Sequence, residues 1–176
     1  AWTIKDINVV VSAVADPCIT TNSSSCLEDA AAPLVVGLTD VDGSESLSLV
    51  LTVPVGSTLS RGTETVPGVW SVSAVQLAAA GPVLSVTPPL HSDLDFVVDV
   101  VATSTEERDG STLDTASSIN VTVTAVADAP SMSLSPSLGR PNVPIPLLAA
   151  VGLVDTDESE FLHDVTISGI GTGVLN

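Results

Sequence analysis

Two short acidic motifs hold the side chains of this sequence that are best suited to chemistry. Each has the pattern Asp-x-Asp-x-x-Glu, which places three carboxylates within six residues. The carboxylates belong to Asp40, Asp42 and Glu45 in the first motif and to Asp155, Asp157 and Glu160 in the second. Calcium in proteins takes about six to eight oxygen ligands, which clustered carboxylates and backbone carbonyls supply. The pattern predicts a calcium site at each motif, and a solvated turn that uses Asp and Gly for the backbone is the alternative.

Other acidic residues are candidate ligands beside these motifs. The adjacent pair Glu28 and Asp29 precedes the first motif, whereas Arg140 stands at the corresponding place before the second. We therefore expect weaker binding at the second motif. The remaining candidates lie in short linkers or in a separate acidic pair, and they are Asp16, Asp93, Asp95 and Asp128.

The two motifs belong to a longer internal repeat. The sequence INVVVSAVADP at residues 7–17 recurs as INVTVTAVADAP at residues 119–130, and the segment 37–47 recurs at 152–162. The offset is 112 residues from residue 7 to 119 and 115 residues from residue 37 to 152. Two ordered matches at nearly one period indicate tandem duplication. A unit of about 100 residues is the size of a β-sandwich domain.

The repeat sets the domain boundaries that we predict. Residues 1–16 are expected to be the last strand of a preceding repeat, residues 17–128 one complete repeat, and residues 129–176 the first half of the next. Two interpretations of the partial repeats stay open. They are a window on a longer array, which we favour, and half-domains that complete one another between molecules by strand addition.

The composition favours strands throughout. Hydrophobic residues make up 44% of the chain, and Val, Ile and Thr suit a pleated, half-buried surface. One stretch, residues 73–80, predicts a short helix. Alternating apolar and polar residues predict strands at residues 47–53, 68–72, 83–87, 96–102, 119–126 and 165–168. The expected fold is therefore all-β, with tandem β-sandwich domains.

The charge excludes several partners. The chain has 21 acidic and four basic residues, a net charge of −17. So few cations cannot neutralise a phosphate backbone, which excludes nucleic acid, and an anionic membrane surface would repel the chain. No apolar run reaches the roughly 20 residues that span a bilayer. Divalent cations are a ready source of the counter-charge that clustered acids need.

The sequence predicts no enzyme and no catalytic residues. His91 and His163 are the only histidines, and they fall at different places in the repeat. Neither lies in a nucleophile elbow or in a zinc-type spacing. Paired carboxylates can hydrolyse glycosides, but their repeated placement at strand ends favours metal binding.

Cysteines and glycosylation sequons indicate an oxidising compartment. Cys18 and Cys26 flank a short Ser- and Thr-rich segment, which predicts a disulfide, and two free thiols are the alternative. The sequon at Asn22 lies inside this segment, and a second sequon at Asn120 lies on a predicted strand. Both are candidate N-glycan acceptors in an extracellular protein.

Several motifs in order resemble a known family over nearly the whole chain. They are Asp-x-Asp-Gly-Ser-Glu-Ser-Leu at 40–47, Thr-Pro-Pro at 87–89, Ser-Asp-x-Asp-Phe at 92–96 and the closing Ala-Val-Ala-Asp-Ala-Pro at 125–130. Together they are similar to the cadherin-like or immunoglobulin-like repeats of giant RTX-type bacterial surface adhesins. The resemblance implies a Greek-key sandwich with calcium at domain junctions. The ligands that it implies are Asp16, Glu28, Asp40, Asp42, Glu45 and Asp128.

The favoured function is a structural and adhesive extender, extracellular and either at the cell surface or secreted. Its partners would be neighbouring repeats of the same chain, with calcium stiffening each junction. One alternative is a subunit of an extracellular filament, such as a flagellar hair or sheath, held by homotypic contacts. A carbohydrate- or ice-binding module that takes a surface glycan or ice, and a spacer attached to a remote enzyme, are the other two.

Overall fold

The chain is built almost entirely from β-strands and divides into two compact units. The computed structural model describes residues 8–12, 14–15, 19–38, 43–78, 84–155 and 159–168. We call residues 1–124 the N-terminal unit and residues 125–176 the C-terminal unit. Apart from one five-residue helix, the regular structure of the described residues is all strand, so the predicted all-β class is confirmed.

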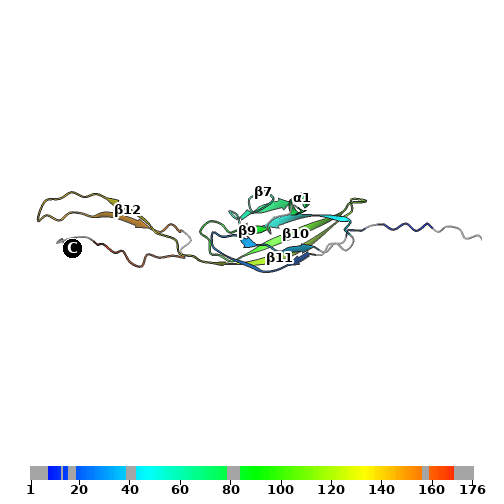
Figure 1. Cartoon of the computed structure of the whole chain (residues 1–176), viewed down its shortest axis with the longest axis horizontal. Helices are drawn as coiled ribbons and strands as arrows, with labels where there is room; N and C mark the ends of the chain where they lie inside the picture. Colours follow the sequence, from blue (N-terminus) through cyan, green and yellow to red (C-terminus); the bar gives the residue numbers. More distant parts are fainter. Residues whose placement is uncertain are drawn as a thin grey trace, which may run out of the picture. The chain divides into compact units, whose positions relative to one another are not determined.

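A six-stranded sheet forms most of the N-terminal unit (Figure 1). Its strands, in spatial order, are β2 (Ser24–Leu27), β11 (Thr112–Thr124), β10 (Phe96–Glu106), β5 (Glu45–Thr52), β8 (Val69–Val72) and β7 (Thr63–Val66). The edge strand β2 runs parallel to β11, and every other pair in this sheet is antiparallel. The long hairpin of β10 and β11 therefore lies near the middle of the sheet, flanked by strands that come much earlier in the chain.

Shorter strands complete the N-terminal unit. A three-stranded sheet has the order β3 (Ala32–Pro33), β9 (Ser85–Thr87) and β6 (Thr58–Leu59). A separate antiparallel pair joins β1 (Ile19–Thr21) to β4 (Val36–Leu38). β1 also contacts β11, since the Thr21 hydroxyl donates to the Ser118 carbonyl at 3.1 Å. The early part of the chain thus closes against the last strand of the unit.

The hydrophobic core follows from the two-residue period of the strands. On β10 the side chains of Val98, Val100 and Ala102 are fully buried, whereas those of the alternate residues Val97 and Val101 are exposed. The core cluster also contains residues of the three-stranded sheet and its flanks, namely Ala32, Leu34, Leu59, Leu84 and Val86. The two sheets therefore share one core.

The single helix, α1 (Ala74–Ala78), begins with a capping box. The Gln76 side-chain oxygen accepts a hydrogen bond from the backbone N–H of Ser73 at 2.8 Å, and the Ser73 hydroxyl oxygen accepts one from the N–H of Gln76 at 3.4 Å. The helix packs against β5. The described part of the helix lies within the stretch 73–80 that the sequence predicts to be helical.

The C-terminal unit contains one strand pair among its described residues, β12 (Ser131–Ser135) and β13 (Leu148–Gly152), which run antiparallel. Its place in the repeat matches the pair of β1 and β4. Gly37 and Gly152 are equivalent in the repeat, and they pair with Thr20 and Ser131 respectively. The repeated sequence thus forms the same kind of strand pair in the N-terminal and the C-terminal unit.

The structure differs from the predicted strands at both ends of the chain. Residues 165–168, predicted as a strand, form none, because no neighbouring strand pairs with them within the described part of the unit. Residues 8–12 and 14–15 also form no strand, although residues of the same sequence type at 120–124 lie in β11. The second predicted boundary, after residue 128, lies near the end of the N-terminal unit at residue 124. The assignment of repeats on either side of it stays a prediction.

A pair of matched substitutions tests the register of β10. Val100→Ala should lower the free energy of unfolding by about 2 kcal/mol, because it removes fully buried methyl groups and leaves a cavity. Val101→Ala makes the same change on the exposed side and should alter it by less than about 0.5 kcal/mol. Urea denaturation measures both values, and equal losses would contradict the register.

Candidate functional site

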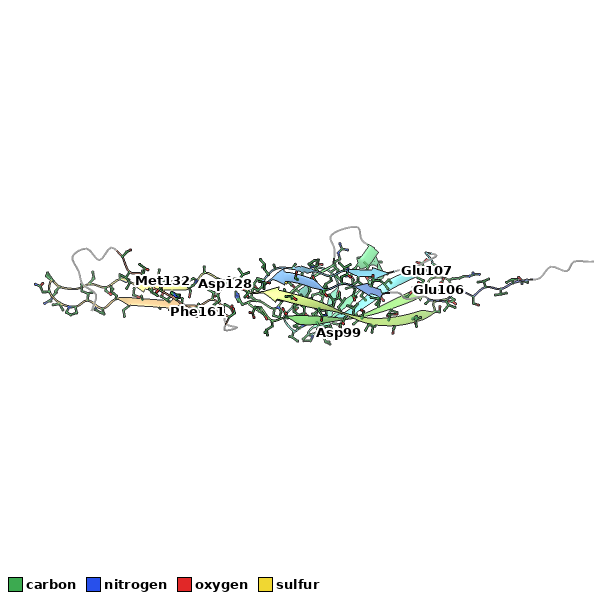
Figure 2. The ribbon with its side chains drawn as sticks, turned by 90° about the horizontal axis from the view of Figure 1, so that it is seen from below. Asp99, Glu106, Glu107, Asp128, Met132 and Phe161 are labelled. Atoms are coloured by element: carbon green, nitrogen blue, oxygen red, sulfur yellow. The ribbon has the colours of Figure 1, made fainter. Side chains whose placement is uncertain are left out.

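The first acidic motif leads into β5, and its described end lies beside a glutamate pair that the sequence did not indicate. Glu45 is the first residue of β5 and stands directly opposite Glu106, the last residue of β10. Glu107 follows in the next turn, and Figure 2 shows Glu106 and Glu107 together at this end of the sheet. Asp40 and Asp42 lie outside the described residues. Two glutamates from neighbouring strands and one from the turn after β10 therefore lie at the end of the sheet where the motif ends.

Glu106 is the most deeply buried acid of this group, with 2% of its surface exposed. The Ser44 hydroxyl donates to Glu106 Oε2 at 2.9 Å, and the backbone N–H of Arg108 donates to Oε1 at 3.2 Å. The N–H of Glu107 donates to the Ser44 carbonyl at 3.0 Å, which ties the turn to the motif a second time. Burying a carboxylate is costly unless hydrogen bonds and opposite charge compensate.

The alternation of buried and exposed residues along β10 is a sequence signal for the burial of Glu106. Buried positions on β10 alternate through residues 98, 100, 102 and 104, and continuing the alternation places residue 106 on the inner face. The strand predicted from the sequence ends at residue 102 and therefore does not include Glu106. The observed strand extends four residues further.

The opposite end of the N-terminal unit, where β10 begins, holds the predicted residues Glu28 and Asp29. Glu28 is buried, with 7% exposed, and its backbone N–H donates to the Thr124 carbonyl at 3.0 Å. Asp29 adopts a left-handed backbone with φ 56°, and so does His91. The N–H of His91 donates to Asp29 Oδ1 at 2.8 Å, and its Nδ1 lies 3.4 Å from Asp29 Oδ2. Asp29 thus joins the loop after β2 to the loop after β9.

The second acidic pair, Asp93 and Asp95, precedes β10 at this same end. Asp95 Oδ1 accepts a hydrogen bond from the backbone N–H of Val123 at 2.8 Å, so this carboxylate closes the end of the β10–β11 ladder. Asp93 is half-buried in the preceding loop. The structure thus groups Asp93 and Asp95 with the β10 start and away from Glu45, which lies at the other end of the same sheet.

In the C-terminal unit the backbone of the linker residue Asp128 contacts Glu160 of the second motif, and Asp155 of the same motif is bonded to Ser159. The backbone N–H of Asp128 donates to Glu160 Oε1, and the Ser159 hydroxyl donates to Asp155 Oδ2 at 2.8 Å. Asp155 is buried, with 6% exposed. Glu160 Oε2 is buried and accepts no hydrogen bond from the described residues. Asp128, Ser159 and Glu160 line a cavity of about 500 Å³. The linker therefore contacts the second motif, whose Asp157 lies outside the described residues.

The cysteines and sequons have the following positions. Cys26 lies on β2, packs against the core and carries a free thiol, and burial raises its pKa. Cys18 and Asp16 lie outside the described residues, so the disulfide stays a prediction. Asn22 is exposed between β1 and β2, and Asn120 is exposed on β11. Both sequon asparagines thus present their side chains to solvent.

The second histidine forms a surface pair. His163 Nδ1 lies 2.6 Å from Asp164 Oδ2, and both side chains are 80% exposed. An exposed pair of this kind contributes little to stability. The absence of an enzyme activity stays a prediction.

No known protein family, curated protein or solved structure matches this chain. Among the described residues no helix is long and apolar enough to cross a membrane.

Burial of Cys26 leads to a test of its surroundings. Because its pKa is raised, less of the thiol is ionised at neutral pH, and the thiolate is the reacting form. In a Cys18→Ser variant, alkylation of Cys26 by iodoacetamide should be slower in the native protein than in guanidinium chloride. Mass spectrometry over time measures both rates, and equal rates would contradict the packing of Cys26.

Proposed function

We propose that this chain is a structural and adhesive extracellular extender, built from tandem β-sandwich repeats that calcium stabilises at the acidic motifs. The observation that carries the proposal is that a buried carboxylate accompanies each motif. Glu106 beside the first motif is 2% exposed, and Asp155 in the second is 6% exposed. Each accepts a hydrogen bond from the serine of the motif. Buried carboxylates require compensation by opposite charge or by metal.

The chain itself has too few cations to provide this compensation. It contains four Lys and Arg residues against 21 acids. Among the described residues, Arg61 donates through Nη1 to the Gln76 carbonyl at 3.1 Å and is thereby engaged at α1. A hard divalent cation matches the carboxylate oxygens that remain. The sites proposed for it are the first motif, with Glu45, and the cluster of Asp128, Asp155 and Glu160.

The strand order supports a Greek-key sandwich as the fold of the repeat. The chain alternates between the two sheets that share the core: β3, β6 and β9 lie in the small sheet, and β5, β8 and β10 lie in the large one. The early strand β2 pairs with the last strand of the N-terminal unit, β11. Crossings of this kind between two sheets are typical of Greek-key sandwiches.

The tandem arrangement is supported by the equivalent strand pairs, β1 with β4 and β12 with β13. The proposed partners are therefore neighbouring repeats of the same chain. The exposed sequon asparagines Asn22 and Asn120 support an extracellular, glycosylated protein. No disulfide is seen at Cys26, so the predicted Cys18–Cys26 disulfide belongs to the same proposal only as a bond that oxidation of this thiol would form.

The filament alternative has one observation in its favour. The outer face of the six-stranded sheet has exposed apolar side chains, which include Val50, Val97 and Val101. It carries few charges for so acidic a chain, and the carboxylates of Asp99 and Asp114 lie on it, the latter bonded to Thr103. Figure 2 shows Asp99 at the margin of the N-terminal unit. Homotypic contact between copies would meet the least charge repulsion here.

A carbohydrate-binding module has less support. Such modules generally stack sugars on exposed aromatic side chains, but Trp70 and Phe96 are partly buried and pack against the core. Phe161 is exposed at 79% in the C-terminal unit and is the aromatic residue of the described chain that most suits that role.

Calcium should raise the thermal stability of the chain. Ligand at a hundred times its dissociation constant stabilises the folded state by about 2.7 kcal/mol, which corresponds to a rise of roughly 10 °C in the melting temperature of a domain of this size. Differential scanning calorimetry in calcium and in EDTA measures the shift. The variant with Asp155→Asn and Glu160→Gln should bind fewer calcium ions in isothermal titration, whereas Asp99→Asn on the sheet face should bind as many as the unmodified chain. Identical melting in calcium and in EDTA would refute the proposal.

A further inference from the structure

Residues 8–12 are of the same sequence type as the end of β11, yet they form no strand. On β11 the side chains of Val121 and Val123 belong to the core and are 1% and 7% exposed. The matching Val9 and Val11 are 74% and 73% exposed. The chain therefore contains a second segment of the β11 type that has no partner strand among the described residues.

In the N-terminal unit, the end of β11 is the partner of strands from the start of the repeat. β2 pairs in parallel with residues 121–124 and is an edge strand of the six-stranded sheet. β1 also contacts β11, where the hydroxyl oxygens of Thr21 and Ser117 lie 2.8 Å apart. The strand β11 thus attaches the first strands of the repeat to the sheet.

The C-terminal unit has the first strands of the repeat but, among its described residues, no strand that corresponds to β11. Since Thr20 and Ser131 are equivalent, the segment that corresponds to β2 is residues 135–138. Residues 136–138 form no strand, and Leu138 is 99% exposed. Residues 135–138 therefore present the edge that β11 covers in the N-terminal unit.

We propose that residues 8–12 of a second copy of this chain add to the C-terminal unit as a strand parallel to residues 135–138. The register of β2 against β11 then places Val11 opposite Ser137. In this arrangement Val11 faces inward, like its counterpart on β11, and Val10 faces solvent. The contact is separate from the proposed calcium sites.

Apolar side chains of the C-terminal unit are exposed where their counterparts in the N-terminal unit are buried or contact β11. Met132 on β12, labelled in Figure 2, matches Thr21, whose hydroxyl contacts β11. The Met132 side chain is 64% exposed. Leu147 is 59% exposed and matches Ala32, which is fully buried. Burial of such apolar surface is the main favourable term in protein association.

The two segments can approach each other although the chain has a net charge of −17. Residues 7–15 carry no charge, and no acidic residue occurs between residues 129 and 154, so the contact brings no like charges together. An added strand also satisfies the backbone N–H and C=O groups of an exposed edge. Proline occurs on edge strands where the side that lacks the N–H faces away from the partner, so Pro136 is compatible with one added strand.

Each copy carries both the donor strand and the receiving edge, so association is head-to-tail and gives rings or open filaments. Sedimentation velocity of the full chain in EDTA should therefore show a mass that rises above that of the monomer with concentration. Val11→Asp should weaken association at least about tenfold, because it would bury a carboxylate without a partner. The matched control Val10→Asp places the same charge on the outer side and should stay within about threefold of the unmodified chain. Thermal melting checks that both variants fold, and neither substitution lies in a strand.

A mixture of two variants tests the donor and the edge separately. Val11→Asp keeps the receiving edge intact. Ser137→Pro keeps the donor strand but adds a second proline next to Pro136, so that two successive N–H groups are missing from the edge. Each variant alone should remain monomeric, and the equimolar mixture should form a one-to-one complex because one intact donor and one intact edge remain.

Three outcomes would overturn the strand addition without touching the calcium proposal. They are a chain that stays monomeric at every concentration, a mixture that forms no complex, and equal losses in Val10→Asp and Val11→Asp. A fourth uses Val101→Asp, which changes the exposed outer face of β10 and should leave association unaltered. Association that is lost in Val101→Asp but kept in Val11→Asp would assign the contact to the outer face of the six-stranded sheet instead.

Discussion

The register of β10 between its two neighbours is the constraint on which the N-terminal unit depends. β10 pairs with β11 on one side and with β5 on the other, and these pairings fix which side chains face the core. A shift of one residue would turn Val98, Val100 and Ala102 to solvent and bring Asp99 inside. The same register places Glu106 on the inner face opposite Glu45. The packing of the core and the geometry beside the first motif thus have one origin.

The distribution of charge follows from the same alternation. Apolar residues occupy the inner positions of the long strands, and most carboxylates of the N-terminal unit lie where strands begin or end. Because the chain has only four basic residues, these acids cannot all be neutralised by side chains. Carboxylates therefore lie at both ends of the N-terminal unit, with Glu45 and Glu106 at one end and Glu28 and Asp29 at the other. Divalent cations are the partners that we propose for these acids.

The two units show how one sequence motif depends on its surroundings. Strand pairs form at equivalent places in both units, so the repeated sequence has the same local secondary structure in each. The serine of the motif, however, binds Glu106 in the N-terminal unit and Asp155 in the C-terminal unit. The contact to Glu106 reaches a strand far away in the sequence, since 62 residues separate Ser44 from Glu106.

The sequence by itself determined the all-β class, the approximate positions of the strands β5, β8, β9 and β10 and of the later part of β11, and the repeat of the acidic motif. These features depend on local composition, two-residue alternation and self-similarity, which can be seen along the chain. It also pointed to Asp128 and Glu160, which the structure joins through the backbone N–H of Asp128. Only the tertiary structure decided that Glu106 lies against Ser44, that Asp95 closes the β10–β11 ladder, and that residues 165–168 form no strand. The physical reason is that strand pairing and burial join residues distant in sequence, and no local pattern specifies which distant partner a strand or a carboxylate will find.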